Sequence, residues 1–599
     1  MKTTLQKISL LFSKVRIEYI WLVYALIFGT FLALFLPPFQ VMDEQQHFQK
    51  AYGVSEGYLA CIRNPDKKPG IHAPTNILNA PQILDVTELP YNSTMQVSER
   101  NMEERAKIKV GGGSAFIQHP FCETPSWSTF PQAIGVGIAR IFDLPMLTMV
   151  HLGRLTNLLV ATLLIFFAIR ITPIGKRFFF FTAALPMFMQ QISSLSLDAF
   201  HYSSLFLFTA WTLKLSRSEE PFGVKQLSLY TLFSILALHA KTGFIFMILL
   251  VFLLPWKKFP SKKIYAAFTV GFAALQFFLF ILIRSALSVS DLANKGAINR
   301  EEQVAYAISH PFDFLAAVGR SINMYFDFYF KNMLGILGWT DASLITLHYV
   351  LLMFGILLLV AMKTGEKVSI KERGILFATW AAVILSIFGA LYAISTPVGD
   401  NYVHLVQGKY FLPVFPLLLL AIAQISIGKN IQKALLILFL IVNGALVYHV
   451  LDKRYYASIE VATSQSEVVQ DWVDIDAKGL VKTTFTASED NLQGVSVYFK
   501  RANMPEGIYR FALRDQTCSR ILASKEINVS LVPEEGYVDI LFDTVLKSRN
   551  QTYCWTIDPD QRVMASPLSV ATIGKTQAGT GTTMREDKIS YLFRTIYKK

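Results

Sequence analysis

The chain has 599 residues, of which 53% are hydrophobic and only 17% are charged. An average soluble domain has about 25% charged residues, and the mean hydropathy of this chain is +0.40. Such a composition cannot provide a water-facing surface over most of the chain, which excludes a string of soluble domains. It predicts a membrane protein.

The formal net charge of +13 is compatible with nucleic-acid binding, but the positions of the basic residues favour another cause. Lys and Arg lie between apolar runs, where they fix the orientation of a multi-pass membrane protein. We therefore expect no nucleic-acid partner.

The four cysteines form two widely separated pairs, Cys61 with Cys122 and Cys518 with Cys554. They show no CxxC spacing, so a zinc or redox motif is not indicated. Both pairs lie in polar segments, which predicts two disulfides, provided that these segments face an oxidising compartment. Free thiols are the alternative.

Apolar runs separated by basic residues predict a mainly α-helical, polytopic bundle of about 11 transmembrane helices. The first run, residues 19–36, follows a basic N-terminus and predicts an uncleaved span with a cytoplasmic N-terminal end. An odd number of spans places the C-terminus outside, and the basic loops agree with this orientation. The other spans are expected at residues 148–169, 177–193, 198–215, 226–240, 242–256, 264–284, 343–362, 373–394, 410–427 and 432–450.

Three regions differ from these spans. Residues 37–147 are polar and predict a long first outer loop within a helical domain of residues 1–451. Residues 285–342 are rich in aromatic residues and Asp, which predicts helices that lie on or dip into the outer membrane surface. Residues 452–599 alternate between short strand patterns and turn residues, which predicts an extracytoplasmic β-sandwich of jelly-roll type.

Two adjacent carboxylates, Asp43 and Glu44, follow the first span, and His47 lies on the same helix face as Asp43. Charged groups beside a membrane core are costly, which favours a function such as general-base catalysis by Asp43. Glu44 is then expected to orient Asp43 or to help hold a divalent Mg²⁺ or Mn²⁺ ion. The alternatives are a helix cap or a zinc peptidase site, which would require a second histidine at this spacing.

Two lysines, Lys241 in a tight turn and Lys409 at the mouth of the tenth span, are predicted on the same outer side. Ammonium groups can bind phosphate, although a solvated turn or an interfacial anchor would also explain them. A base and two cations at one face suit transfer from a membrane-bound phosphate donor. The other residues expected to contact the substrate are His47, Asp198, His201, Asp341, Gln407 and Tyr410.

At these residues the sequence resembles the DUF2142 family of bacterial membrane proteins, which is similar to the GT-C superfamily of integral-membrane glycosyltransferases. The resemblance covers residues 18–450, and Lys409 stands where the family more often has arginine. It rests on the run from Pro37 to Phe48, on Arg154 to Asn157, on Asp198, on the Lys241 turn and on the segments 338–341 and 407–410.

The resemblance implies a first outer loop that bears the catalytic carboxylate Asp43, and a polyprenyl-phosphate-linked sugar as donor for an inverting displacement. We therefore expect a glycosyltransferase that adds a sugar to a surface glycan outside the bacterial cytoplasmic membrane, with Lys241 and Lys409 binding the donor phosphate. A lipid-linked glycan transporter or a non-catalytic assembly partner is the alternative. A transporter would need polar groups through the membrane midplane, whereas the candidate groups here gather at the outer face.

Overall fold

The computed structural model describes residues 16–598 except for 67, 85, 88, 91–96, 98–101, 103–104, 119, 288–297, 362–367, 424–428, 457–458, 464–470, 476–480, 502–507, 530–531, 533–534, 560–567 and 573–592. The chain divides into two compact units. The helical unit comprises Met1–Val86 and Glu103–Leu451, and the β unit comprises Thr87–Met102 and Asp452–Lys599. The β unit thus takes in part of the predicted first outer loop together with the residues from Asp452 onwards.

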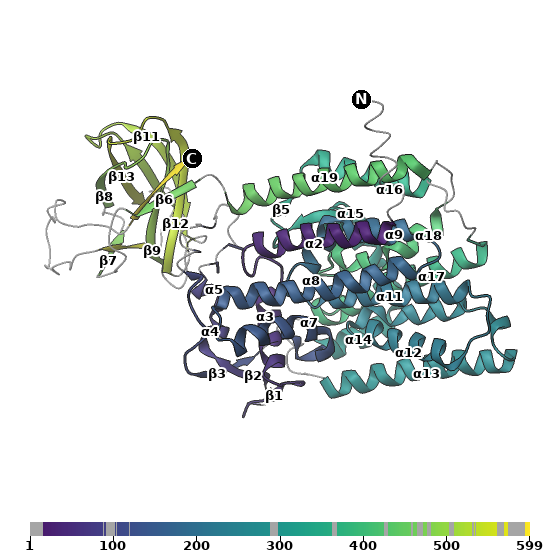
Figure 1. Cartoon of the computed structure of the whole chain (residues 1–599). Helices are drawn as coiled ribbons and strands as arrows, with labels where there is room; N and C mark the ends of the chain where they lie inside the picture. Colours follow the sequence, from purple (N-terminus) through teal and green to yellow (C-terminus); the bar gives the residue numbers. More distant parts are fainter. Residues whose placement is uncertain are drawn as a thin grey trace. The chain divides into compact units, whose positions relative to one another are not determined.

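Long helices form the body of the helical unit, and α2 and α8 lie side by side in it (Figure 1). Among the described residues, four helices are long and apolar enough to cross a membrane: Ile17–Phe35 in α2, Met146–Ile171 in α8, Lys262–Ser285 in α13 and Ile370–Ser395 in α17. The predicted membrane protein is thereby supported, whereas the total of about 11 spans stays a prediction. Other long helices are α11 (Asp198–Ser216), α12 (Val224–Leu238), α15 (Pro311–Gly335), α16 (Thr346–Ala361) and α19 (Lys429–Tyr455). The whole of α13 extends over Lys262–Leu287, and the whole of α17 over Ile370–Ser395.

Three of the predicted spans are irregular. The segment expected at 177–193 consists of α9 (Lys176–Ala184) and α10 (Pro186–Ile192), because a proline has no N–H to continue a helix and starts a new one instead. The segment expected at 410–427 begins with the 3₁₀ helix η6 (Gly408–Val414) and continues as α18 (Phe415–Ile422). The segment expected at 242–256 is the 3₁₀ helix η3 (Thr242–Leu253), followed by η4 (Trp256–Lys258).

The aromatic segment between the seventh and eighth predicted spans contains α14 (Arg300–Ser309) and α15 (Pro311–Gly335). One side of α15 packs through Val318 and Tyr329 into a cluster with Phe388 of α17. The other side exposes Phe312 and Phe326. A tight turn between β4 (Ile336–Leu337) and β5 (Ala342–Ser343) follows the helix. Helices were predicted here, and their depth in the membrane stays a prediction.

The part of the predicted first outer loop that belongs to the helical unit is well structured. Its sheet has the order β1-β2-β3, and α3 packs against α7 and η1. The disulfide between Cys61 and Cys122, with a Cα–Cα distance of 5.7 Å, ties the chain next to this sheet to η1. The elements are α3 (Glu44–Ser55), β1 (Ile62–Arg63), β2 (Pro69–Pro74), α4 (Thr75–Leu78), α5 (Ala80–Ile83), β3 (Ser114–Gln118), η1 (Pro120–Glu123), η2 (Ser126–Thr129) and α7 (Phe130–Ile141).

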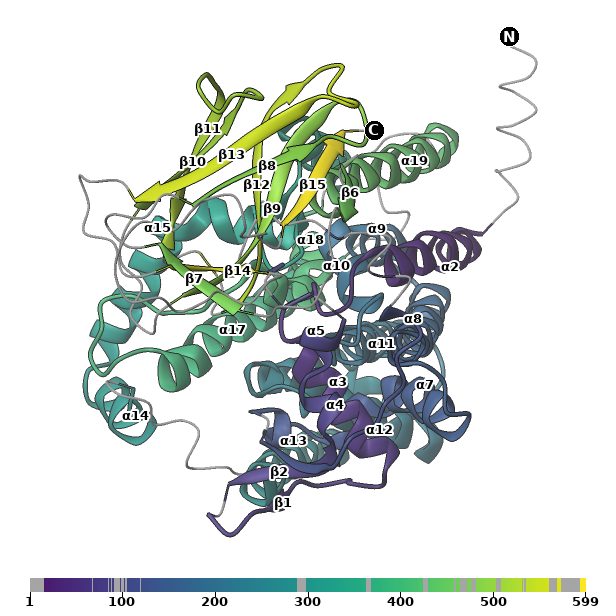
Figure 2. The same ribbon diagram turned by 90° about the vertical axis from the view of Figure 1, so that its left-hand side faces the viewer.

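The β unit contains two antiparallel sheets. One has the order β11-β10-β13-β8, and Figure 2 shows these strands side by side. The other sheet follows the path β6-β15-β9-β14-β7, in which β15 and β14 pair with different parts of the same edge of β9. The strand β12 pairs with the opposite edge of β9. The strands are β6 (Ile459–Thr463), β7 (Asp471–Ile475), β8 (Val481–Thr486), β9 (Leu492–Arg501), β10 (Ile508–Arg514), β11 (Ile521–Asn528), β12 (Glu535–Val545), β13 (Thr552–Pro559), β14 (Leu568–Thr572) and β15 (Phe593–Lys598).

The two sheets share one apolar core. Alternate residues of a strand point to the same face, and Val497 and Phe499 of β9 are fully buried together with Phe511 and Trp555 of the other sheet. The ring centroids of Trp555 and Phe593, one from each sheet, are 5.7 Å apart. This supports a β-rich C-terminal region, while its jelly-roll topology stays a prediction.

Both predicted disulfides are confirmed. Besides Cys61–Cys122, Cys518 is bonded to Cys554, with a Cα–Cα distance of 5.3 Å. The second bridge connects the turn after β10 with the neighbouring strand β13. Free thiols, the alternative reading of the sequence, are thereby excluded for these four residues.

Candidate active site

The loop between α2 and α3 carries the first candidate residue, Asp43. Two of its residues, Phe39 and Asp43, have left-handed backbone conformations with φ values of 62° and 65°. Such conformations are uncommon for residues other than glycine, and Asp tolerates them better than most. Asp43 occupies the position before the first turn of α3 and is half-buried, yet its side chain does not cap the helix. The helix-cap alternative therefore does not explain this residue.

Glu44 has a different environment from its neighbour. Its carboxylate forms a two-pronged ion pair with Arg154 of α8, with Nε–Oε1 and Nη2–Oε2 distances of 2.8 and 2.6 Å. Oε1 also accepts a hydrogen bond from the Leu195 backbone N–H at 2.9 Å. Both side chains of the pair are fully buried. The structure thus places Glu44 in a closed ion pair, whereas the sequence suggested that it orients Asp43 or assists a metal.

The second candidate group is centred on Asp198, the first residue of α11. One of its carboxylate oxygens is paired with Lys241, and the other lies 3.9 Å from the Lys409 Nζ. Lys241 precedes η3 and Lys409 lies in η6, so three distant segments meet here. Asp198 and Lys409 are almost entirely buried, whereas the side chain of Lys241 is 26% exposed.

Tyr410 connects the two lysines with Asp43. Its ring centroid lies 5.1 Å from Lys241 Nζ and 5.7 Å from Lys409 Nζ, so both ammonium groups approach one aromatic face or edge. The Asp43 loop reaches the same segment, because the Met42 sulfur lies 2.9 Å from the Gln407 side-chain amide. The Asp43 carboxylate adds to the electrostatic field at Lys409 and Tyr410. Two carboxylates and two ammonium groups therefore share one partly exposed site.

The Gln-Gly-Lys-Tyr segment reaches this site because its backbone is tightly held. A Cβ atom on Gly408 would lie 1.9 Å from the Tyr329 carbonyl oxygen, so only glycine permits this approach to α15. Asn332 of α15 accepts a hydrogen bond from the Lys409 N–H at 3.1 Å, and Tyr202 of α11 donates one to the Lys409 carbonyl at 2.9 Å. Gln407 contacts the sulfur of Met42, next to Asp43, at 2.9 Å.

The two candidate histidines are buried and packed against aromatic rings. His47 of α3 is 5% exposed and stacks on Phe121, with ring centroids 4.3 Å apart. Burial lowers the pKa of His47 to about 3; the Asp198 carboxylate opposes this shift, and the nearby lysines add to it. His201 is fully buried, one turn after Asp198, with its ring edge-to-face against Phe244. At neutral pH His47 is therefore uncharged, and its ring packs against Phe121.

Asp341 belongs to a supporting turn. Its carboxylate accepts a hydrogen bond from the Trp339 backbone N–H at 2.9 Å, and the Trp339 indole donates one to the Phe39 carbonyl at 2.8 Å. The turn is further held by Gln190, which accepts a hydrogen bond from the Gly338 N–H at 2.8 Å. Asp341 thus shapes the turn that contacts the Asp43 loop.

Several residues that build the site could not be assigned a role from the sequence. Tyr202 and Asn332 hydrogen bond to the backbone of Lys409, and Phe121 stacks on His47. Aromatic and amide side chains are common in such a chain, so the sequence did not indicate these contacts. Arg154 could have been recognised as a paired residue, because a charge inside a predicted membrane span usually has a specific partner. Its partner could not be chosen from the sequence, since 110 positions separate it from Glu44.

No group of three or more His, Cys, Asp or Glu side chains that could hold a metal ion occurs among the described residues. Both oxygens of Glu44, the residue suggested as a metal helper, accept hydrogen bonds from Arg154.

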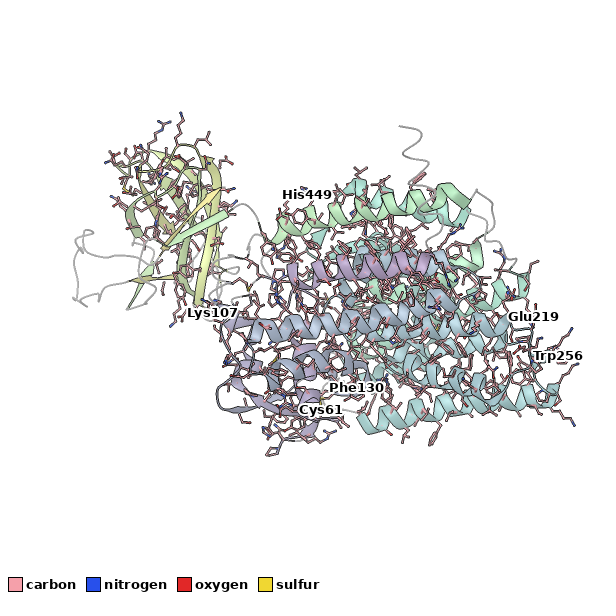
Figure 3. All side chains as sticks on the ribbon, viewed as in Figure 1. Cys61, Lys107, Phe130, Glu219, Trp256 and His449 are labelled. Atoms are coloured by element: carbon pink, nitrogen blue, oxygen red, sulfur yellow. A yellow bond between two sulfur atoms is a disulfide. The ribbon has the colours of Figure 1, made fainter. Side chains whose placement is uncertain are left out.

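The long helices separate two ends of the helical unit. Figure 3 places Cys61 towards one end and Glu219 and Trp256 at the other. Cys61 belongs to the segment predicted to lie outside, and Glu219 and Trp256 lie in or next to loops predicted to lie inside. The two sets of loops are thus at opposite ends of the same helices.

Comparison with known sequences gives the family. The pattern of a family described as predicted membrane proteins, DUF2142, matches residues 26–418. No curated protein and no solved structure matches the chain. The family match extends over more than half of the sequence and includes the Asp43 loop, Arg154, Asp198, Lys241 and Lys409. The protein therefore belongs to the DUF2142 family of predicted membrane proteins.

Proposed function

We propose that this protein is a membrane glycosyltransferase that transfers a sugar from a polyprenyl-phosphate-linked donor to a surface glycan. The observation that carries the proposal is the meeting of Lys241 and Lys409 on Asp198 and Tyr410, beside the Asp43 carboxylate. Sugar transfer from a phosphate requires a base for the acceptor hydroxyl and cations for the leaving phosphate, and this site offers both.

In the proposed reaction, Asp43 accepts the proton of the acceptor hydroxyl. The hydroxyl oxygen forms a bond to the anomeric carbon of the donor, while the bond from that carbon to the phosphate oxygen breaks. The electron pair of the broken bond leaves with the polyprenyl phosphate, and Lys241 and Lys409 neutralise its charge. Attack opposite the leaving group inverts the anomeric configuration.

Glu44 takes a structural role in this mechanism, because both of its oxygens are engaged by Arg154. Asp43 is the remaining carboxylate at the start of α3, and it is half-buried rather than sealed. The uncharged His47 and the ring of Tyr410 supply surfaces on which a sugar can rest.

We place the reaction on the outer face of the bacterial cytoplasmic membrane, with the N-terminus inside and the β unit outside. Disulfides persist in oxidising compartments, and Cys61–Cys122 belongs to the same outer loop as Asp43, while Cys518–Cys554 lies in the β unit. The β unit would hold the acceptor glycan. These two bridges and the positive-inside pattern support the orientation.

A transfer assay with the purified full-length protein in lipid nanodiscs and a synthetic polyprenyl-phosphate sugar tests the proposal. We expect Asp43→Asn to reduce transfer about 10²–10⁴-fold, because general-base catalysis typically contributes this much. Asp143→Asn is the matched control, since Asp143 is another aspartate with positive φ and is exposed. Equal activity of Asp43→Asn and the wild type would remove Asp43 from the mechanism.

A second candidate function, transport of a lipid-linked glycan, is favoured by one observation. His348 hydrogen bonds to Asn443 at 2.7 Å, and Asn443 donates to the Tyr24 hydroxyl at 3.1 Å, in the middle of α2 and α19. Polar groups within membrane spans often line a transport path. Translocation of a fluorescent lipid-linked sugar in proteoliposomes, without sugar transfer, would favour the transporter over the enzyme.

A further inference from the structure

The position of Asp43 is set by its surroundings rather than by its own bonds. Its left-handed backbone, with φ of 65°, and the absence of a side-chain cap mean that the residue would relax if the loop were released. Unfavourable backbone conformations persist only where neighbouring structure holds them. The residues that hold this loop therefore control where the carboxylate points.

Arg154 of α8 holds the loop. Besides the ion pair with Glu44, its guanidinium donates to the carbonyls of Ala33, Leu36 and Pro37 at 3.0, 2.6 and 2.9 Å. The carbonyls of Ala33 and Leu36 lie at the C-terminal end of α2, where helices leave such groups without helical partners. One fully buried side chain thus fixes both ends of the loop, at residues 33–37 and at Glu44.

Asn157, one helical turn further along α8, holds the segment that leads to Asp198. Its side-chain amide donates to the carbonyls of Ser194 and Ser196 at 2.7 and 3.0 Å. The same segment is tied to Glu44 through the Leu195 N–H. Arg154 and Asn157 lie three residues apart and share a helix face.

We infer that Arg154 and Asn157 are positioning residues on one face of α8. They hold the Asp43 base in a fixed position relative to the donor-binding group, which consists of Asp198, Lys241 and Lys409. This inference rests on the proposed function. Arg154 acts on the base and Asn157 on the donor-binding group, so the two residues should affect different kinetic constants. A merely structural role would instead weaken both constants together, along with the stability of the fold.

Two variants separate these roles in the transfer assay. Arg154→Lys keeps the charge but lacks the planar fork that reaches Glu44 and three carbonyls. Its kcat should fall about 100-fold, the loss expected for a displacement of about 1 Å, with donor affinity within about threefold of wild type. Asn157→Ala should weaken donor affinity about tenfold, with a smaller change in kcat, because a loosened Asp198 segment no longer orders the lysines.

Arg140→Lys is the matched control. Arg140 pairs with Glu56 and donates to the Ser55 carbonyl, at the end of α3 far from Asp43, and both side chains of the pair are about one-third exposed. We expect this variant to keep kcat and donor affinity. Glu44→Gln, which preserves size and the acceptor for Leu195 N–H, replaces Arg154→Lys if the latter is not recovered as folded protein.

Hydrogen exchange gives a readout that does not depend on turnover. Arg154→Lys should speed amide exchange in residues 36–48, and Asn157→Ala in residues 193–198, with the rest of the helical unit unchanged. A wild type that transfers no sugar, with these local changes present, would end the proposed function but keep the positioning. Parallel losses in kcat and affinity for both variants, or no change in either variant, would overturn the positioning itself.

Discussion

The helical unit and the β unit bury very different side chains. The strands of the β unit enclose an apolar core, with Phe499, Phe511 and Trp555 fully buried, and their buried polar side chains are serines and threonines. The buried Arg454 of this unit lies outside the strands, at the end of α19. The helical unit buries whole charges, among them Glu44, Arg154, Asp198, Lys409 and Lys50.

This difference supports assigning the proposed chemistry to the helical unit. Moving a charge out of water is costly, and a buried ion pair often contributes less stability than an apolar pair of the same size would. The β unit shows that this chain can build an ordinary core. The buried Asp198 and Lys409 therefore favour a role in binding or catalysis, whereas Glu44 and Arg154 form a closed structural ion pair.

The largest expected effect comes from removing both cations of the site. Lys241→Met combined with Lys409→Met should weaken donor binding at least about 1,000-fold, because each truncated partner of a buried charge pair costs about 2–5 kcal/mol. Donor titration monitored by fluorescence measures this, with Lys331→Met as control, since Lys331 pairs with Asp327 on an exposed helix face. Unchanged affinity would show that the lysines only neutralise Asp198.

A core substitution in the β unit should have the opposite pattern. Trp555→Ala should destabilise that unit by about 3–5 kcal/mol, since it removes a fully buried aromatic side chain. Donor affinity should stay within about twofold of wild type, because the proposed donor site belongs to the helical unit. Denaturation of the full-length protein and donor titration measure the two quantities, with Trp555→Phe as the milder control. A tenfold loss of donor affinity would contradict the assignment of donor binding to the helical unit alone.

The smallest effect, when expressed per pH unit, is expected in the pH dependence of stability. Lys50 of α3 is 5% exposed and donates to the carbonyls of Phe121 and Thr124 at 2.8 and 2.5 Å. Burial lowers the pKa of Lys50 to about 7, below its ordinary value of 10.5. Between pH 7 and 10.5 the unfolded chain therefore binds more protons at this residue, so stability should rise with pH through this window and level off below it.

Lys50→Met should remove this slope, which amounts to at most about 1.4 kcal/mol per pH unit for one proton. Thermal unfolding of the wild type and the variant from pH 6 to 10 measures it. Lys68→Met serves as the control, because Lys68 is exposed in the same loop. An equal slope in the wild type and Lys50→Met would assign the pH dependence to other groups.

The sequence predicted the parts of the site better than their pairing. Asp43, Asp198, Lys241 and Lys409 could be singled out because charges next to apolar runs are conspicuous. Their distances depend on how helices pack, and one sequence carries no information on that. The same limit explains Glu44, which looked like a helper of Asp43 until its pairing with Arg154 was known.

Secondary structure was predictable where hydrophobic length alone decides it. The helices Met146–Ile171 and Ile370–Ser395 lie close to the expected spans, since about 20 apolar residues suffice to cross a bilayer. The break before Pro186 and the 3₁₀ helix Thr242–Leu253 were not foreseen. A Cβ atom on Gly243 would lie 2.9 Å from the Ile387 side chain, so close packing against α17 contributes to that departure.

Photo-crosslinking tests the central claim most directly. A polyprenyl-phosphate sugar analogue with a photoreactive group beside the phosphate would be bound to the full-length protein, irradiated and mapped by mass spectrometry. The account predicts labelled peptides that contain Lys241, Lys409–Tyr410 and the Asp43 loop, with labelling suppressed by unlabelled donor. Specific labelling confined to other segments, with these three unlabelled, would contradict it.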